Sequence, residues 1–391
     1  MQLWVDLQGA AVLRYLIFPI LLVAALLSFS LSSQSQAEKA KTNKCLTFFG
    51  TYTDGSSKGI YYCSFDSATG ELTNPQASIQ DALKNPSFLA VHPDKKYLYA
   101  VSETENGSIW SFKISDSGEL KFLNKQASGG DGPCYVSIDT TGKVALVANY
   151  NSGSVASFPI QADGSLGAAV SVIKHSGSGR DPKRQAGPHA HSMSVSPNNR
   201  FAVACDLGAD NLLIYKLNTE KAKISLAQTF QVRPGAGPRH FKFSASGKFL
   251  YVANELSNNI AVYTFDQEKG KLIEEIQLIS TIPNPDTPNT VAEIQIDPAG
   301  KYLFCSNRGE DSIAVYAIDP NAGTLRPAAY QKTKGQTPRN FSIDPSGNYL
   351  VVCNQASNNV LVFKIDQSSG HLLQIEEPVT VPSPVCVKFV P

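Results

Sequence analysis

Side chains suited to acid–base and anion chemistry recur at spaced positions along the middle of this 391-residue chain. Histidine titrates near neutral pH, carboxylates exchange protons, and arginine grips carboxylate or phosphate through paired hydrogen bonds. Such a set suits acid–base catalysis on an anionic ligand. In chain order the candidates are Arg184, His189, His191, Asp206, Arg239, His240, Glu255, Glu293, Arg308 and Arg339.

Most of these residues lie on a sequence pattern that repeats about every 50 residues. Two segments align residue by residue: GPRHFKFSASGKFLYVANELSNNIAVYTF, which starts at 237, and TPRNFSIDPSGNYLVVCNQASNNVLVFKI, which starts at 337. The same frame opens at 86, 133, 188, 238, 291 and 338, with spacings of 47, 55, 50, 53 and 47 residues. Each unit contains four short β-type runs separated by turn residues, which is typical of a β-propeller blade.

The two ends of the chain supply one further unit. Residues 383–390 (SPVCVKFV) match a first strand with nothing after it, and residues 45–80 match strands two to four with nothing before them. Joined together they close the ring and leave no open sheet edge. The sequence therefore predicts an all-β fold, a seven-bladed β-propeller over 45–391, closed by the C-terminal first strand.

This fold predicts where the candidate residues meet. The first two strands of a blade are antiparallel, so the start of the first and the end of the second reach the same rim. Arg239 and His240 then lie beside Glu255, and the other candidates pair in the same way around the mouth of the central channel. The equivalent places in two other blades hold Ser87 and Cys134. The repeat pattern is regular, but only some of its units carry charged residues at these positions. Binding of a ligand explains this difference better than packing does.

Several candidates also have a purely structural interpretation. His189 or His191 is either a general base or a hydrogen-bonded core histidine, and the sequence does not choose between them. Glu255 and Arg239 equally fit an ordinary ion pair between strands. Asp206 shares its repeat position with asparagines that cap strand ends, which favours a structural role. Arg184 lies in the inserted loop 177–188, which suits either substrate binding or a solvated turn.

The N-terminal segment is typical of an export signal. Arg14 precedes the apolar run 15–27, and a serine-rich stretch follows that ends in SQA at 35–37. This pattern predicts a signal peptide over 1–37 and a polar tether over 38–44. The apolar run is short for a bilayer span, although its extension leaves an uncleaved membrane anchor open. We therefore expect an exported protein, periplasmic or extracellular.

Composition excludes several other classes of protein. With 34 basic and 33 acidic side chains, the chain lacks the basic surplus that nucleic-acid binding requires. Its 42% hydrophobic content excludes a disordered chain, and a single long apolar run excludes a polytopic membrane protein. Seven cysteines cannot all pair. Cys205, Cys305 and Cys353 are expected in buried strands, whereas a bridge from Cys386 to Cys45 or Cys63 stays open.

The motifs GTYT, GIYYCSFDSATGEL, PHAHS, DLGAD, GPRHF, VANEL and SNRG resemble those of the seven-bladed lactonase family. This family contains bacterial propeller-type 6-phosphogluconolactonases and fungal carboxymuconate-lactonizing enzymes. The resemblance runs from about Cys45 to Pro391. It implies an active-site group made of His189 or His191 with Arg239, Glu255 and Arg308.

The resemblance implies a lactone hydrolase that needs no metal or cofactor. The histidine, together with Glu255, would deprotonate water, while Arg239 and Arg308 would stabilise the oxyanion and hold an anionic group. Arg339, Arg184, His240, Glu293 and Asp206 are the expected substrate contacts. An export signal fits poorly with 6-phosphogluconolactone, which is a cytoplasmic metabolite. The alternatives are a muconate-type cyclase and a non-enzymatic exported binding protein; the oligomeric state stays open.

Overall fold

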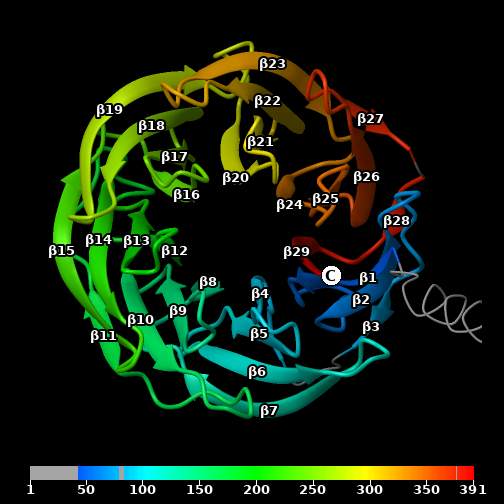
Figure 1. Cartoon of the computed structure of the whole chain (residues 1–391), viewed down its shortest axis with the longest axis horizontal. Helices are drawn as coiled ribbons and strands as arrows, with labels where there is room; N and C mark the ends of the chain where they lie inside the picture. Colours follow the sequence, from blue (N-terminus) through cyan, green and yellow to red (C-terminus); the bar gives the residue numbers. More distant parts are fainter. Residues whose placement is uncertain (1–42, 79–82, 376) are drawn as a thin grey trace, which may run out of the picture. The chain divides into compact units, whose positions relative to one another are not determined.

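The repeated units fold as antiparallel sheets arranged in a ring, as the sequence predicts (Figure 1). The computed structural model describes residues 43–78, 83–375 and 377–391, which contain strands and turns and no α-helix. Accordingly, nothing in these ranges is a helix long and apolar enough to cross a membrane. Residues 44–391 form one compact unit. The predicted signal peptide and most of the predicted tether lie outside the described residues, so both stay predictions.

Six blades are each built from one continuous segment, with the first strand of each nearest the channel. In chain order their strands are β4 (Leu89–Val91), β5 (Tyr97–Ser102), β6 (Ser108–Ile114) and β7 (Leu120–Ala127); β8 (Pro133–Ile138), β9 (Val144–Asn149), β10 (Ser154–Pro159) and β11 (Ser171–Lys174); β12 (Ala190–Val195), β13 (Phe201–Asp206), β14 (Asn211–Asn218) and β15 (Lys223–Gln231). The next three blades hold β16 (Pro238–Phe243), β17 (Phe249–Asn254), β18 (Asn259–Asp266) and β19 (Lys271–Ser280); β20 (Thr290–Ile296), β21 (Tyr302–Arg308), β22 (Ser312–Ile318) and β23 (Leu325–Lys332); β24 (Pro338–Ile343), β25 (Tyr349–Asn354), β26 (Asn359–Ile365) and β27 (Leu372–Gln374), with β28 (Val379–Thr380) also on β26.

The seventh blade joins the two ends of the chain, which confirms the predicted closure. Its strand order is β29 (Pro384–Val390), β1 (Lys44–Thr51), β2 (Tyr61–Asp66) and β3 (Gln76–Ala77). The C-terminal strand β29 takes the innermost place and pairs antiparallel with β1. Because this pairing completes the ring, the blade also fixes the two terminal segments against their neighbours.

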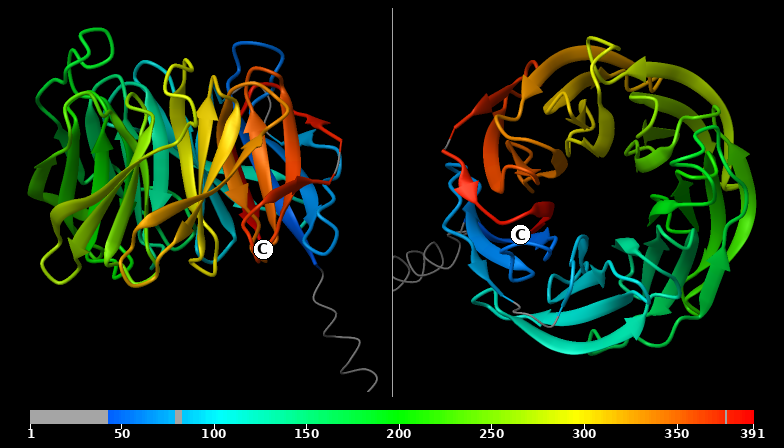
Figure 2. Two further views of the ribbon diagram at one scale, coloured as in Figure 1. Left: turned by 90° about the horizontal axis from the view of Figure 1, so that it is seen from above. Right: turned by 180° about the vertical axis from the view of Figure 1, so that it is seen from behind.

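The hydrophobic core lies between neighbouring blades rather than at the centre of the ring. One cluster, for example, joins Val252 and Leu250 of β17 to Val203 and Ile214 of the preceding blade. Seen from the side, the strands cross the ring from one face to the other (Figure 2). Burying each such aliphatic side chain stabilises the fold by about 1.5–3 kcal/mol. This packing makes the ring a rigid frame for the polar residues along its channel.

A β-bulge interrupts the pairing near the start of the inner strands. In β16, for example, Pro238 pairs with Asn254 and His240 pairs with Ala253, so Arg239 is the extra residue. Such a bulge re-aims the extra side chain and is common at functional rims. We call the following extra residues the bulge residues: Cys134, His191, Arg239, Arg339 and Val385.

All seven cysteines are buried and none forms a disulfide. The expected burial of Cys205, Cys305 and Cys353 in strands is confirmed. The bridge that was left open from Cys386 to Cys45 or Cys63 is not formed, because Cys386 on β29 packs toward β4, where the Leu89 amide donates to its sulfur at 3.4 Å.

Candidate active site

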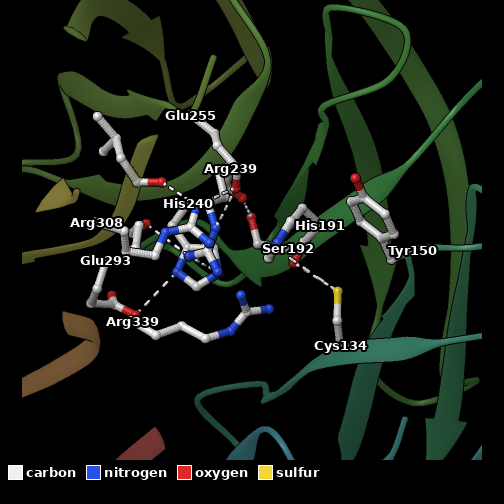
Figure 3. A network of polar contacts seen from close by, with 12 residues as sticks. Cys134, Tyr150, His191, Ser192, Arg239, His240, Glu255, Glu293, Arg308 and Arg339 are labelled. Carbon is white, nitrogen blue, oxygen red and sulfur yellow. Dashed lines mark hydrogen bonds and ion pairs between the residues drawn. The ribbon is translucent and has the colours of Figure 1, made fainter. Parts of the chain in front are cut away.

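One carboxylate, Glu255, contacts three guanidinium groups at the rim where β17 ends. Two of the three arginines, Arg239 and Arg308, are labelled beside it in Figure 3. Its Oε1 lies 2.7 Å from Arg184 Nη2, and its Oε2 lies 2.9 Å from Arg239 Nε and 2.8 Å from Arg308 Nη2. We call these four residues the arginine–glutamate cluster. The cluster carries two more positive than negative charges, so it is suited to receive an anion.

The charges of this cluster hold each other in their ionised forms. Burial would raise the pKa of Glu255, but Arg308, Arg239 and Arg184 outweigh it and lower that pKa to about 2. Burial and the neighbouring guanidiniums lower the pKa of Arg308 to about 10, although Glu255 opposes the shift. The Arg308 Nε is buried and has no hydrogen-bond partner among the described residues. That N–H group is an unsatisfied donor within the cluster.

His191 is the histidine that faces the channel. It is a bulge residue of β12, and its ring meets the edges of Tyr150 and His240 at centroid distances of 5.4 and 5.2 Å. Its Nδ1 lies 3.9 Å from the Cys134 sulfur, whereas no described residue bonds its Nε2. Burial, then Arg239, His240 and Arg339, lower its pKa well below the usual value of 6.5. The imidazole is therefore neutral at pH 7, with Nε2 available.

His189 takes a different place, just before β12. Its ring stacks on Tyr150 at 4.4 Å and 14°, its Nδ1 lies 2.9 Å from the Tyr150 carbonyl oxygen, and its amide donates to Asp206. The expected repeat frame was wrong here, because Ala190, and not residue 188, pairs at the opening position. The two-residue shift makes His191, rather than His189, equivalent to Arg239.

Asp206 serves the backbone of this blade. Its carboxylate lies 2.6 Å from His175 Nδ1 and accepts the amides of His189 and Ala209 at 2.8 and 2.9 Å. The side chain has no exposed surface. These contacts match the structural alternative for Asp206, and the structure does not bring its carboxylate to the channel.

A chain of polar contacts links His240, Glu293 and Asn340, which lie on three successive inner strands, β16, β20 and β24. His240 and Asn340 each directly follow a bulge residue. His240 Nδ1 lies 3.0 Å from Glu293 Oε2, to which Asn340 Nδ2 donates at 2.5 Å. His240 Nε2 lies 3.3 Å from Arg239 Nη1. Burial and Arg239 lower the pKa of His240 to about 4, so the neutral ring accepts from Arg239 and donates to Glu293. This chain holds the Arg239 guanidinium in place.

Arg339 anchors the opposite wall of the channel. It donates to the Tyr52 hydroxyl at 3.0 Å and lies over the Tyr52 ring at 5.5 Å. The same hydroxyl donates to Glu103, which also accepts from the Ser87 hydroxyl. Burial opposes it, but the Tyr52 oxygen and the carboxylates of Glu103 and Glu255 raise the pKa of Arg339, so this guanidinium stays protonated.

These groups enclose a narrow cavity at the mouth of the channel, whose free space of about 10 Å³ corresponds to roughly one water molecule. We call it the channel cavity. The lining combines two neutral imidazoles, two guanidiniums, a carboxylate and a thiol, and it includes all five bulge residues. The lining residues are Ser87, Phe88, Glu103, Cys134, His191, Arg239, His240, Arg339, Asn340 and Val385. Arg184, Glu255 and Arg308 are the cluster beside it.

Comparison with known proteins places the chain in a family. A family model described as "Lactonase, 7-bladed beta-propeller" matches residues 47–389. The chain belongs to this lactonase family. The resemblance drawn from the sequence motifs is thereby confirmed.

Named relatives and solved structures agree with the lactonase family. The chain is 38% identical to a 6-phosphogluconolactonase of Bacillus subtilis, over 88% of this chain and 98% of the relative. It resembles the structure of a putative 6-phosphogluconolactonase of Bacteroides fragilis at a TM-score of 0.83 and 36% identity, covering 90% and 99% of the two chains. A periplasmic gluconolactonase of Pseudomonas aeruginosa gives a TM-score of 0.83 at 33% identity, covering 89% and 99%.

Sequence reasoning missed three residues of this lactonase-family rim: Tyr52, Glu103 and Tyr150. Each directly follows the second strand of its blade, β1, β5 or β9. This is the repeat position that Glu255 occupies after β17, so the repeat itself held the signal. In these three blades the opening residues of the inner strand are uncharged, so the charged-residue pattern does not point to this position.

No metal-binding group stands out in this lactonase-family structure. Among residues 43–78, 83–375 and 377–391, no three His, Cys, Asp or Glu side chains lie together in a way that would hold a metal ion. A reaction that proceeds without metal or cofactor stays a prediction.

Proposed function

We propose that the chain hydrolyses a sugar lactone at the mouth of the channel, against the lining of the channel cavity. The observation that carries this proposal is the cavity lining itself, where His191, with a free Nε2, faces Arg239 and Arg339. Membership of the lactonase family and the relatives named as lactonases support the reaction class. Opening a cyclic ester needs a held water and a cationic partner for the oxyanion, and this lining supplies groups for both.

Each group has a distinct place in this reaction. His191 Nε2 accepts a hydrogen bond from the attacking water and orients it. Arg239 and Arg339 stabilise the oxyanion that forms when water adds to the lactone carbonyl. The charge develops beside buried guanidiniums, where hydrogen bonds to an anion are strongest.

Glu255 takes a role other than the one expected from the family pattern. With three guanidiniums around it and a pKa near 2, this carboxylate has little tendency to take a proton from water. We assign it to positioning Arg239 and Arg308. The positive surplus of the cluster then binds an anionic substituent of the substrate, which favours a 6-phosphoglucono-type lactone.

We further propose that the protein is exported. The N-terminal pattern supports this location, and the Pseudomonas relative is named as periplasmic. An exported enzyme would meet unphosphorylated lactones. The proposed location therefore favours an unphosphorylated substrate, whereas the positive charge of the cluster favours a phosphorylated one.

The experiment is a lactone screen on the purified full chain. Hydrolysis of 6-phosphogluconolactone and of gluconolactone is followed by acid release, with the spontaneous rate subtracted. We expect saturable hydrolysis, with a higher kcat/KM for the phosphorylated ring. Rates equal to the spontaneous rate on both lactones would overturn the proposal. Ring closure of a carboxymuconate by the same sample would instead favour a cyclase.

A further inference from the structure

Glu103 stands apart from the other carboxylates near the channel. It lines the channel cavity, and no Lys, Arg or His among the described residues forms an ion pair with it. Glu255 is instead neutralised by three guanidiniums, and Glu293 is engaged by His240, Asn340 and Gln295. Glu103 is therefore the carboxylate at the channel cavity that no cation neutralises by direct contact.

The hydrogen bonds of Glu103 leave part of its capacity unused. Tyr52 donates to Oε1 at 3.1 Å and to Oε2 at 3.0 Å, and Ser87 donates to Oε2. An ionised carboxylate offers about four acceptor sites, so Oε1 has room for a further donor. A water molecule in the cavity is such a donor. The two hydroxyls also fix the carboxylate, which helps a proton transfer by positioning its acceptor.

Glu103 and His191 differ in their exposure, because Glu103 is only partly buried whereas His191 is buried. Desolvation penalises the charged form of an imidazole, which makes a buried imidazole a weaker base. His191 is strongly affected in this way, because its pKa lies well below 6.5 with burial as the largest cause. His191 thus suits a hydrogen-bonding role better than it suits the role of base.

We propose that Glu103 is the catalytic general base of the lactone hydrolysis, an inference that rests on the proposed function. The water oxygen bonds to the lactone carbonyl carbon while one water proton passes to Glu103, and the carbonyl electrons move to the oxygen that Arg239 and Arg339 face. When the carbonyl re-forms, the ring C–O bond breaks. The departing oxygen takes the proton back from Glu103, and the product is a hydroxy acid.

The test compares Glu103→Gln with Glu105→Gln, which changes an exposed glutamate two residues away. Glutamine keeps the shape and one acceptor oxygen but does not serve as a general base. We expect kcat to fall about 100-fold or more with KM nearly unchanged, in line with the usual contribution of a general base. The Glu105 variant should match the unchanged protein.

A second variant guards against a purely structural effect. In Glu103→Ala, added formate or acetate enters the vacated space, and the rescued rate should rise with the basicity of the carboxylate. Retention of more than a third of kcat in Glu103→Gln, or rescue that ignores basicity, would overturn the role of Glu103. Absence of hydrolysis by the unchanged chain would instead overturn the proposed function.

Discussion

The two sides of the channel mouth use the same backbone position for opposite purposes. Glu255 and Glu103 each directly follow the second strand of their blades, yet one is held by three guanidiniums and the other by two hydroxyls. Where cations surround the carboxylate it becomes a fixed charge that positions arginines. Where hydroxyls surround it, the carboxylate has no cation in direct contact, which is the setting of the proposed general base. Environment, rather than residue type, assigns the role.

The contrast also explains why one side looks functional in the sequence and the other does not. Charged residues recur from 184 to 339, whereas Ser87 and Cys134 hold the matching places on the opposite side. Their side chains nonetheless line the same cavity as His191 and Arg239. A ring of blades makes neighbours of residues far apart in sequence, so a plain-looking blade still contributes one wall of the site.

Removing the fixed charge should have the largest effect. Glu255→Gln leaves Arg239 and Arg308 buried without their carboxylate, and breaking a buried ion pair in this way costs about 3–5 kcal/mol. Urea unfolding at pH 7 measures the loss. Glu103→Gln, whose partners are neutral hydroxyls, should cost about 1 kcal/mol. Equal costs for the two variants would contradict the contrast between them.

Arg239→Ala tests the catalytic side of the same cluster. The guanidinium lines the channel cavity, so its loss should lower kcat/KM for the lactone by about 100- to 1000-fold. Steady-state kinetics on the folded variant measure this change. Arg200→Ala serves as the control, because Arg200 is exposed and pairs with exposed Glu268. An unchanged kcat/KM in Arg239→Ala would remove this residue from the mechanism.

Acid should weaken the fold in two windows. His240 has a pKa near 4 against the usual 6.5, so the unfolded chain binds a proton that the folded chain refuses, and stability falls as the pH drops from 6.5 to about 4. Glu255, at about 2 against 4.5, gives stability that is complete above pH 4.5 and is lost toward pH 2. Urea unfolding across this range checks both windows. His240→Gln should shrink the first window without abolishing it, because His191 also has a lowered pKa.

More of the fold than of the candidate site could be predicted from the sequence. A repeat of about 50 residues predicts the blades, and the matching chain ends predict the closure between β29 and β1. The charged rim follows from antiparallel strand ends, which is why Arg239, Glu255 and Arg308 were found together. These inferences need only periodicity and strand direction.

Register and hydrogen bonding were the parts that the sequence left undecided. The choice between His189 and His191 depends on Ala190 pairing with Asp206, a register that motif matching placed two residues early. The importance of Glu103 depends on Tyr52, which lies in a different blade and 51 residues away. Contacts between blades at this level depend on side-chain packing, which a repeat pattern does not specify.

The smallest effect is expected at Arg184, the most exposed arginine of the cluster. Its side chain is 39% exposed, and its pairing with Glu255 crosses from the inserted loop to the rim. Such a partly solvated pair contributes about 1 kcal/mol or less to stability. Arg184→Ala should therefore leave unfolding nearly unchanged, but it removes a cation from the place where we expect the anionic substituent.

The kinetic signature should separate binding from chemistry. For a phosphorylated lactone, KM should rise several-fold at nearly constant kcat, because the lost contact acts equally on the bound substrate and the transition state. For an unphosphorylated lactone, KM should stay within about twofold. Lys183→Ala, one residue away and exposed, is the matched control. A fall in kcat on both lactones would instead show that Arg184 positions Glu255 and, through it, the catalytic arginines. The loop 177–188 would then belong to the catalytic arrangement and not only to substrate binding.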